Sequence, residues 1–179
     1  MKIVFDKVKA LPFLLTLFVL TADQIVKAII VKNWPMNSLV KDVFNNGFLY
    51  IYHVRNKAIA FSLGTNFPDA ARLVLFIAVP ILVLGFLCYY YWVSPEVQGI
   101  QRWAIAGIIG GGLGNISDRI FRPDGVVDYV SVKFYGLFGL ERWPTFNIAD
   151  ASVVISCLAF LLTVFMVPKQ TGEKAESHE

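Results

Sequence analysis

The chain has 179 residues, of which 56% are hydrophobic and 16% are charged, and its mean hydropathy is +0.61. This composition does not suit the surface of a water-soluble domain, so we expect an integral membrane protein and exclude a cytosolic enzyme. The formal net charge is only +3 and no run of lysine and arginine occurs, so nucleic-acid binding is not expected. With two histidines, and both cysteines inside apolar runs, a zinc site is not expected either.

Four apolar segments predict an all-α polytopic membrane protein with four transmembrane helices, because each is long enough to cross a bilayer. They lie at about residues 11–31, 70–93, 103–120 and 148–167. Three lysines precede the first segment, as in a cleavable signal peptide that would end at Ala22. The apolar pattern continues to Val31, however, and therefore favours a membrane span.

The second and third segments contain residues that affect helix shape and packing. Pro80 lies inside the second segment and predicts a kink, because proline has no backbone N–H to donate. In the third segment, glycines four residues apart share a helix face. The pairs are Gly107 with Gly111 and Gly110 with Gly114. These faces predict the close approach of another helix or of an extended substrate.

Two segments outside the helices, about 32–69 and 121–147, predict a small extracytoplasmic antiparallel β-cradle. Residues 48–54 follow the hairpin signal Asn46-Gly47 and alternate large apolar side chains with other residues. Residues 126–134 alternate in the same way. We also expect a short amphipathic helix at the membrane interface.

The whole chain, residues 1–179, is predicted to form a single membrane domain. Four spans place both termini on one side of the membrane, and the lysines near the N-terminus favour the cytoplasmic side. The cradle would then face outward. The polar tail, residues 168–179, would be cytoplasmic and disordered.

Ionisable residues at membrane depth are costly to bury and therefore mark candidate sites. Asp23 and Lys27 are four residues apart near the outer end of the first helix, so they can pair with each other. Two interpretations remain open. The pair is either a structural ion pair or a binding site in which Lys27 neutralises a substrate carbonyl or phosphate.

Three further polar residues project from one side of the third helix near its end: Asn115, Asp118 and Arg119. Arg119 could pair bidentately with a carboxylate, and Asn115 could bind a peptide backbone. The structural alternative is a capping and salt-bridge cluster at the helix end.

Asp128 and Asp150 form the sharpest candidate pair. Asp128 shares its strand face with apolar residues, where an unpaired carboxylate is costly, and Asp150 opens the fourth helix after Asn147. Two carboxylates that share one proton can act as acid and base on water and an amide carbonyl. Asn147 could instead only cap the helix. His53 has no evident nucleophile partner and is expected to decorate the sheet.

Two other functions are compatible with acids in a membrane protein. An ion- or proton-coupled transporter would need acids along a continuous polar path near mid-bilayer. A non-catalytic tetraspan subunit would use the glycine-rich helix for assembly and would tolerate replacement of either aspartate.

Five motifs occur in order along nearly the whole chain. They are Asp23-Gln24 with Lys27; Arg55-Asn56 followed by Ala60-Phe61-Ser62; Gly111 with Asn115-Ile116-Ser117-Asp118-Arg119; Val126-Val127-Asp128-Tyr129; and Phe146-Asn147-Ile148-Ala149-Asp150-Ala151. In these motifs and their spacing, the chain resembles the bacterial lipoprotein signal peptidases, also called signal peptidase II.

The resemblance implies an inner-membrane aspartyl endopeptidase that removes the signal peptide from prolipoproteins, just before the diacylglyceryl-modified cysteine. Asp128 and Asp150 fall on the family's catalytic pair. The positions that support this pair or line the substrate site are Asp23, Lys27, Asn56, Gly111, Asn115, Asp118, Arg119, Asn147 and Ala151. The resemblance also implies four transmembrane helices with an outer β-cradle and a short periplasmic helix, an active site near the outer face, and no metal or organic cofactor.

The partners implied by the resemblance are diacylglyceryl-modified prolipoproteins, membrane lipids and globomycin-type peptide inhibitors bound at the aspartates. The chain departs from the family pattern after Asn56. There the family usually has Asn-x-Gly-Ala-Ala-Phe, and Ala58 and Ile59 stand at the glycine and first alanine positions, which bears on the shape of the cradle. Tyr129 stands where phenylalanine is more usual.

Overall fold

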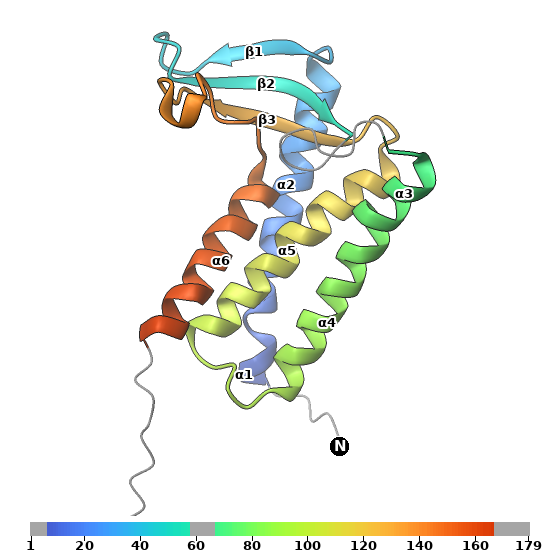
Figure 1. Ribbon diagram of the computed structural model, residues 1–179, viewed down its shortest axis with the longest axis vertical. Helices are drawn as coiled ribbons and strands as arrows, with labels where there is room; N and C mark the ends of the chain where they lie inside the picture. The colour runs from blue at the N-terminus through green and yellow to red at the C-terminus, as the bar shows by residue number, and fades with distance from the viewer. Residues whose placement is uncertain (1–6, 58–66, 167–179) are drawn as a thin grey trace, which may run out of the picture.

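Long helices run side by side and carry a small sheet across one end of the bundle (Figure 1). The computed structural model describes residues 7–57 and 67–166. Its helical elements are α1 (Lys7–Ala10), α2 (Phe13–Asn33), α3 (Asp69–Leu73), η2 (Val74–Ala78), α4 (Val79–Val93), α5 (Ile100–Phe121), η3 (Leu137–Gly139) and α6 (Ile148–Met166). The four predicted helices are therefore present, with ends a few residues from the predicted ones.

The second helical run is interrupted next to its proline. Elements α3, η2 and α4 follow one another without a gap, and η2 is a π-helical segment. Pro80 lies in the first turn of α4, directly after η2. Because Pro80 has no N–H to donate to the preceding turn, the regular α-helical ladder is broken at this point. A π-helical segment thus stands next to Pro80, and the predicted kink stays a prediction.

Helix α5 lies at the centre of the bundle and contacts α2, α4 and α6. Its glycines allow this close packing. A Cβ atom at Gly110 would lie 3.0 Å from the backbone of Thr16 on α2, and one at Gly107 would lie 2.1 Å from the Ser156 Oγ on α6. The predicted close approach of neighbouring helices is confirmed, because the two glycine faces receive two different helices.

Three helices in the described part of the chain are long and apolar enough to cross a membrane: Lys7–Asn33, Ala70–Val93 and Ile148–Phe165. Large apolar side chains on these helices remain exposed, for example Phe18, Leu82 and Leu162. Such a surface suits lipid rather than water. The buried glycines and alanines of α5 are instead enclosed by the other helices.

The sheet has three antiparallel strands in the order β1 (Ser38–Asp42), β2 (Leu49–Asn56) and β3 (Val126–Val132). The predicted hairpin joins β1 to β2 through residues 43–48, with Gly47 at φ +76°. This loop is longer than the two-residue turn that Asn-Gly favours. Strand β1 was not predicted, because its short mixed sequence has no clear alternation of large apolar residues.

A register shift between Ile51 and Val54 breaks the predicted alternation of β2. As a result, His53 is buried rather than placed on the sheet surface, with 3% of its surface exposed. Its Nδ1 atom lies 2.8 Å from the carbonyl oxygen of Trp34, at the end of α2. The expectation that His53 decorates the sheet was wrong, because a bulge reverses which side chains face inward.

The described residues between the long helices do not contain the predicted short interfacial α-helix. The helical turn in this part is η3, a 3-10 turn of three residues. The departure at Ala58 and Ile59, the motif Ala60-Phe61-Ser62 and the tail 168–179 lie outside the described residues.

Candidate active site

The strand that carries Asp128 also positions the start of the helix that carries Asp150. Phe146 pairs with Val130 of β3, with an N–H to carbonyl distance of 3.0 Å in one direction and 2.8 Å in the other. Helix α6 begins two residues later, at Ile148. This pairing brings Asn147 and the first turn of α6 beside Asp128.

Asn147 joins the two aspartates directly. Its side-chain amide nitrogen donates to Asp128 Oδ1 at 2.8 Å, and its backbone N–H donates to Asp150 Oδ2 at 3.1 Å. Its side-chain oxygen accepts from the Asp150 backbone N–H at 2.9 Å. The last two bonds form a reciprocal capping box at the start of α6. Asn147 therefore both caps the helix, as its structural interpretation required, and contacts both aspartates.

Two more asparagines hold the remaining carboxylate oxygens. The side-chain amide of Asn56, at the end of β2, donates to Asp128 Oδ2 at 3.1 Å. The side-chain amide of Asn115, on α5, donates to Asp150 Oδ1 at 2.7 Å. Each aspartate thus accepts hydrogen bonds from amide groups at both oxygens, and these bonds fix the orientation of the two carboxyl groups.

A buried ion cluster lies next to this pair. Lys27 and Asp23 are fully buried, and the Lys27 ammonium lies 2.8 Å from Asp23 Oδ2 and 3.1 Å from Asp118 Oδ2. The third contact of the ammonium is with the side-chain oxygen of Asn115, at 3.1 Å. The predicted pairing of Asp23 with Lys27 is confirmed. Asp118, predicted from a separate helix, belongs to the same cluster.

The ion cluster is also bound to the backbone of the candidate site. Asp23 Oδ1 accepts from the Ala149 N–H of α6 at 3.0 Å, and Asp118 Oδ2 accepts from the Val127 N–H of β3 at 3.0 Å. Ala149 and Val127 are sequence neighbours of Asp150 and Asp128. The cluster therefore ties α2 and α5 to the two segments that carry the aspartates.

Sequence reasoning missed two members of this cluster. Arg122 makes an ion pair with Asp118 and donates to the side-chain oxygen of Gln24 at 2.9 Å. The amide of Gln24 donates to Asp118 Oδ1 at 3.0 Å. Arg122 could have been found by its spacing, because it follows Asp118 by four residues just as Lys27 follows Asp23.

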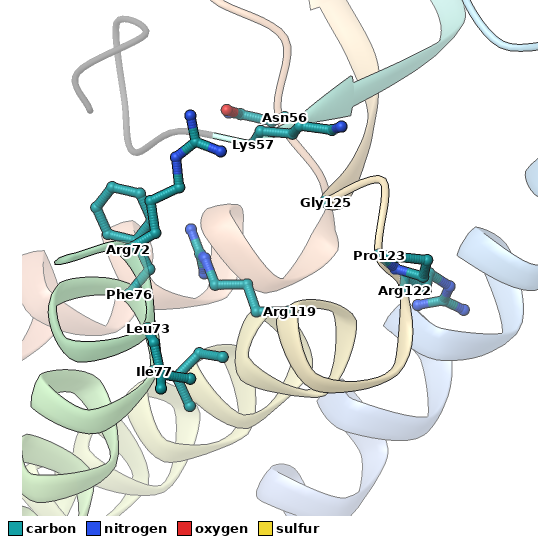
Figure 2. A pocket seen from close by; sticks show the side chains of 10 residues that line it. All are labelled: Asn56, Lys57, Arg72, Leu73, Phe76, Ile77, Arg119, Arg122, Pro123 and Gly125. Atoms are coloured by element: carbon teal, nitrogen blue, oxygen red, sulfur yellow. The ribbon is translucent and has the colours of Figure 1, made fainter. Parts of the chain in front are cut away.

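Arg119 lies beside the aspartates, at the wall of a cavity. Its guanidinium is 3.5 Å from the Asn115 carbonyl oxygen and 5.9 Å from the centre of the Phe76 ring. The negative charges of Asp150 and Asp128 attract this guanidinium. Figure 2 shows Arg119 entering the cavity from α5, and Arg72 from α3. Arg122, the next arginine along the chain, makes the ion pair with Asp118.

Of the two small residues of the predicted site, Gly111 lies where α5 meets α6 and Ala151 lies in the first turn of α6. A Cβ atom at Gly111 would lie 2.3 Å from the carbonyl oxygen of Ala149, so a side chain would push the start of α6 away. Ala151 follows Asp150 directly, and its N–H donates to the Asn147 carbonyl oxygen at 3.1 Å. Gly111 therefore sets how closely the helix of Asp150 can approach α5.

Burial changes the acidity of Asp128, which is 2% exposed. Removal from solvent, with repulsion from Asp150, raises the pKa of Asp128 from 3.8 to about 7. Hydrogen bonds from Asn56 and Asn147 act in the opposite direction. Burial also raises the pKa of the neighbouring Tyr129, whose hydroxyl oxygen accepts from the Ile148 N–H. Asp128 is therefore suited to hold a proton near neutral pH.

The buried acids of the site gather next to the sheet: Asp128 lies on β3, Asp118 accepts from the Val127 N–H of β3, and Asp23 joins Asp118 through Lys27. A transporter would instead be expected to place acids along a path between the two ends. This arrangement favours a single reaction site over a transport path. At this site, carboxyl groups that accept hydrogen bonds from amides lie beside a cavity.

Comparisons with known proteins agree with this geometry. Residues 15–166 match the family described as Signal peptidase (SPase) II. A lipoprotein signal peptidase of Treponema denticola is 46% identical over 147 residues, 80% of this chain and 82% of that protein. The one of Treponema pallidum is 39% identical over 174 residues, 97% of this chain and 93% of that protein.

A solved structure described as a bacterial membrane enzyme has the same fold. It superposes with a TM-score of 0.75 at 26% identity and covers 95% of this chain and 94% of its own. The family match spans both aspartates and the ion cluster beside them. The chain therefore belongs to the signal peptidase II family, the membrane-bound aspartic peptidases that remove signal peptides from prolipoproteins.

Proposed function

We propose that Asp128 and Asp150 are the catalytic pair, and that they hydrolyse the peptide bond before the diacylglyceryl-modified cysteine. One observation carries this proposal. Asn147 bonds to a carboxylate oxygen of each residue, at 2.8 and 3.1 Å, so the two acids are held together at the start of α6.

The raised pKa of Asp128 suggests how the pair divides its work. Near neutral pH, Asp128 carries the proton that the pair shares, and Asp150 serves as the base. Water attacks the amide carbonyl carbon and gives a proton to Asp150, while Asp128 gives its proton to the carbonyl oxygen. The tetrahedral intermediate then collapses. The C–N bond breaks, Asp150 protonates the leaving amine, and Asp128 recovers a proton from a hydroxyl of the intermediate.

The neighbouring residues support this pair in three ways. Asn56, Asn115 and Asn147 orient the carboxyl groups through the hydrogen bonds described above. Asp23, Lys27 and Asp118 hold the surrounding backbone as a buried ion cluster. Gly111 keeps the junction of α5 and α6 narrow, Ala151 follows Asp150 in the first turn of α6, and Arg119 faces the cavity, where the substrate backbone would lie.

The proposed membrane arrangement is a single domain with four spans, in which α5 is the fourth. Helix α5 has 22 residues and is surrounded by the three apolar spans, which would shield its charged ends from lipid. The start of α2 and the end of α6 lie at the same end of the bundle, opposite the sheet (Figure 1). Both termini, with the tail 168–179, would then be cytoplasmic, and the active site would lie near the outer face.

The proposed partners follow from this arrangement. The acyl chains of the prolipoprotein would remain in the bilayer while its peptide enters between the helices and the sheet. Membrane lipids would surround the apolar helices, and globomycin-type peptide inhibitors would compete with the substrate at the aspartates.

The test is cleavage of a purified diacylglyceryl prolipoprotein by the wild-type chain and by the Asp128→Asn and Asp150→Asn variants. Loss of general acid–base chemistry should lower turnover by about 1,000-fold or more in each variant. Asp124→Asn is the matched control, because Asp124 is an exposed acid just before β3. Near-normal turnover by a folded Asp128 or Asp150 variant would show that the catalytic assignment is wrong.

A further inference from the structure

A loop at one end of the sheet carries large apolar side chains on its surface. It runs over residues 133–143, contains η3 and is called the aromatic loop below. Its exposed large side chains are Tyr135, Leu137, Phe138 and Trp143, and 83% of the Phe138 surface is exposed. The loop lies outside the three apolar spans. An exposed apolar surface of this kind marks a contact with lipid or with another protein.

Hydrogen bonds hold the aromatic loop against the sheet. The Phe134 N–H donates to the Glu141 carbonyl oxygen at 2.8 Å and closes the loop at its base. The Arg142 guanidinium donates to the carbonyl oxygens of Ser131 and Gly47, each at 2.7 Å. The loop is therefore tied both to β3 and to the turn before β2. Its exposed rings project from a backbone that is held in place.

The backbone of the aromatic loop is strained at two of these exposed residues. Tyr135 and Phe138 have φ angles of +53° and +54°. Side chains of this size rarely adopt such angles, because the Cβ atom crowds the backbone. Each residue thus costs folding energy through its backbone and gains little from its ring, which lies on the surface. Glycine would avoid both costs, so a contact outside the chain explains the rings better than folding does.

The position of the aromatic loop favours lipid as this contact. The loop lies at the end of the sheet on the α6 side of the bundle (Figure 1). Residues 144–147 join it to α6, which begins at Ile148. Exposed apolar side chains continue along α6, at Val154, Ile155 and Leu158. The loop thus extends the lipid-facing wall of this span toward the sheet, where aromatic side chains of membrane proteins meet the headgroups.

Tyrosine and tryptophan suit this depth because each has an apolar ring and a polar tip. We infer that the aromatic loop inserts Tyr135, Leu137 and Phe138 into the headgroup region of the leaflet next to the sheet. The sheet, with Asp128 on β3, is then held at a fixed height over the bilayer. This contact rests on the proposed membrane spans and not on the catalytic assignment.

The test measures the depth of the loop in a bilayer. The full-length chain with Cys88→Ala and Cys157→Ala receives one new cysteine, which is labelled with a fluorophore. It is placed in lipid nanodiscs as a single copy. Lipids with a nitroxide beside the headgroup quench a label in the interface, and iodide quenches a label in water. Quenching by the nitroxide lipid should be at least about threefold stronger at Leu137→Cys than at Lys41→Cys.

Two comparison sites make the outcome readable. Lys41 is exposed on the edge strand β1, and Leu158 is exposed in the middle of α6. If Leu158→Cys is shielded from iodide but Leu137→Cys is as open to it as Lys41→Cys, the loop lies in water and the inference is wrong. If Leu158→Cys is open as well, the proposed spans are wrong and the inference falls with them.

A second variant tests whether the rings hold the loop in the interface. Tyr135→Gly/Phe138→Gly removes both rings and keeps the backbone, because glycine adopts a positive φ without strain. It should lower the nitroxide quenching of the Leu137→Cys label by about threefold or more. The control Phe86→Ala/Tyr89→Ala removes two exposed rings from α4 and should leave this quenching unchanged. Equal losses in the two variants would contradict anchoring by the loop.

Crosslinking separates lipid from a second copy of the chain as the contact. In liposomes that hold many copies, Phe138→Cys should form disulfides between chains no faster than Lys41→Cys, because lipid surrounds position 138. Faster crosslinking at position 138 would make the loop an interface between copies, and the lipid inference would be wrong.

Discussion

The two groups of acids next to the sheet differ in the partners that their carboxylates have. Asp23 and Asp118 contact the Lys27 ammonium, so their charges are balanced within the cluster. Asp128 and Asp150 accept hydrogen bonds from amides. An ammonium partner favours the charged form of a carboxylate, whereas burial and repulsion from Asp150 raise the pKa of Asp128 to about 7. The same residue type therefore serves structure in one group and, in the proposed mechanism, proton transfer in the other.

Replacing Lys27 with methionine should have the largest effect on stability. It leaves Asp23 buried without its cation and leaves Asp118 with Arg122 alone, which costs about 3–5 kcal/mol in the free energy of unfolding. Chemical denaturation in detergent micelles measures this loss. The Asp23→Asn/Lys27→Met double variant should recover part of it, because one uncompensated charge is removed. If the double variant is no more stable than the single one, the cluster is not held by charge balance.

The pH dependence of cleavage tests the other group. The pKa of Asp128 is raised from 3.8 to about 7 in the folded protein, so its proton is lost as the pH rises through about 7. The kcat/KM should therefore fall above pH 7, by about tenfold per pH unit at the steepest. The stability of the protein should change in the same direction. The folded state binds this proton more tightly than the unfolded state, so the free energy of unfolding falls as the pH rises from 3.8 to about 7.

A profile of kcat/KM from about pH 5 to 9 measures this fall above pH 7. The Asp124→Asn variant should keep it unchanged, because Asp124 is exposed and lies outside the pair. A kcat/KM that continues to rise above pH 8 would contradict Asp128 as the proton donor.

The Asn147→Ser variant separates the two roles of the residue that joins the aspartates. A serine oxygen can still accept from the Asp150 N–H, so the helix cap is kept. The buried bonds of the Asn147 amide to Asn115 and Val127 are lost, which costs about 1–3 kcal/mol in the free energy of unfolding. The bond to Asp128 Oδ1 is lost, and turnover should fall by about tenfold. Thermal unfolding and turnover are measured together. A loss of stability without a loss of turnover would mean that Asn147 acts only as a cap.

The smallest expected effect concerns Tyr129, whose hydroxyl oxygen accepts from the Ile148 N–H at 3.2 Å. In Tyr129→Phe this N–H at the start of α6 loses its partner, which costs about 1 kcal/mol. Turnover should fall by less than about tenfold, because the neighbouring capping box is untouched. A drop as large as that of Asp128→Asn would give the hydroxyl a direct part in the reaction.

Helix positions and the pairing of Asp23 with Lys27 could be predicted because they depend on local sequence. A hydrophobic run of spanning length and a spacing of four residues each have one simple physical reading. The predicted hairpin and strand β3 were confirmed for the same reason. Strand β1 and the burial of His53 were not predicted, because a bulge and a weak pattern hide which side of a strand faces inward.

The sequence by itself determined the chemical groups of this protein: apolar helices, glycine faces, buried acids and motifs typical of signal peptidase II. Only the tertiary structure decided which acids share partners. Asp118 joins Lys27 across two helices, and Asp128 meets Asn147 because Phe146 pairs with β3. The cavity that Arg119 enters likewise exists only where α3, η2 and α5 meet the end of β2. Such contacts join residues far apart in the chain, and local sequence patterns carry no information on their distances.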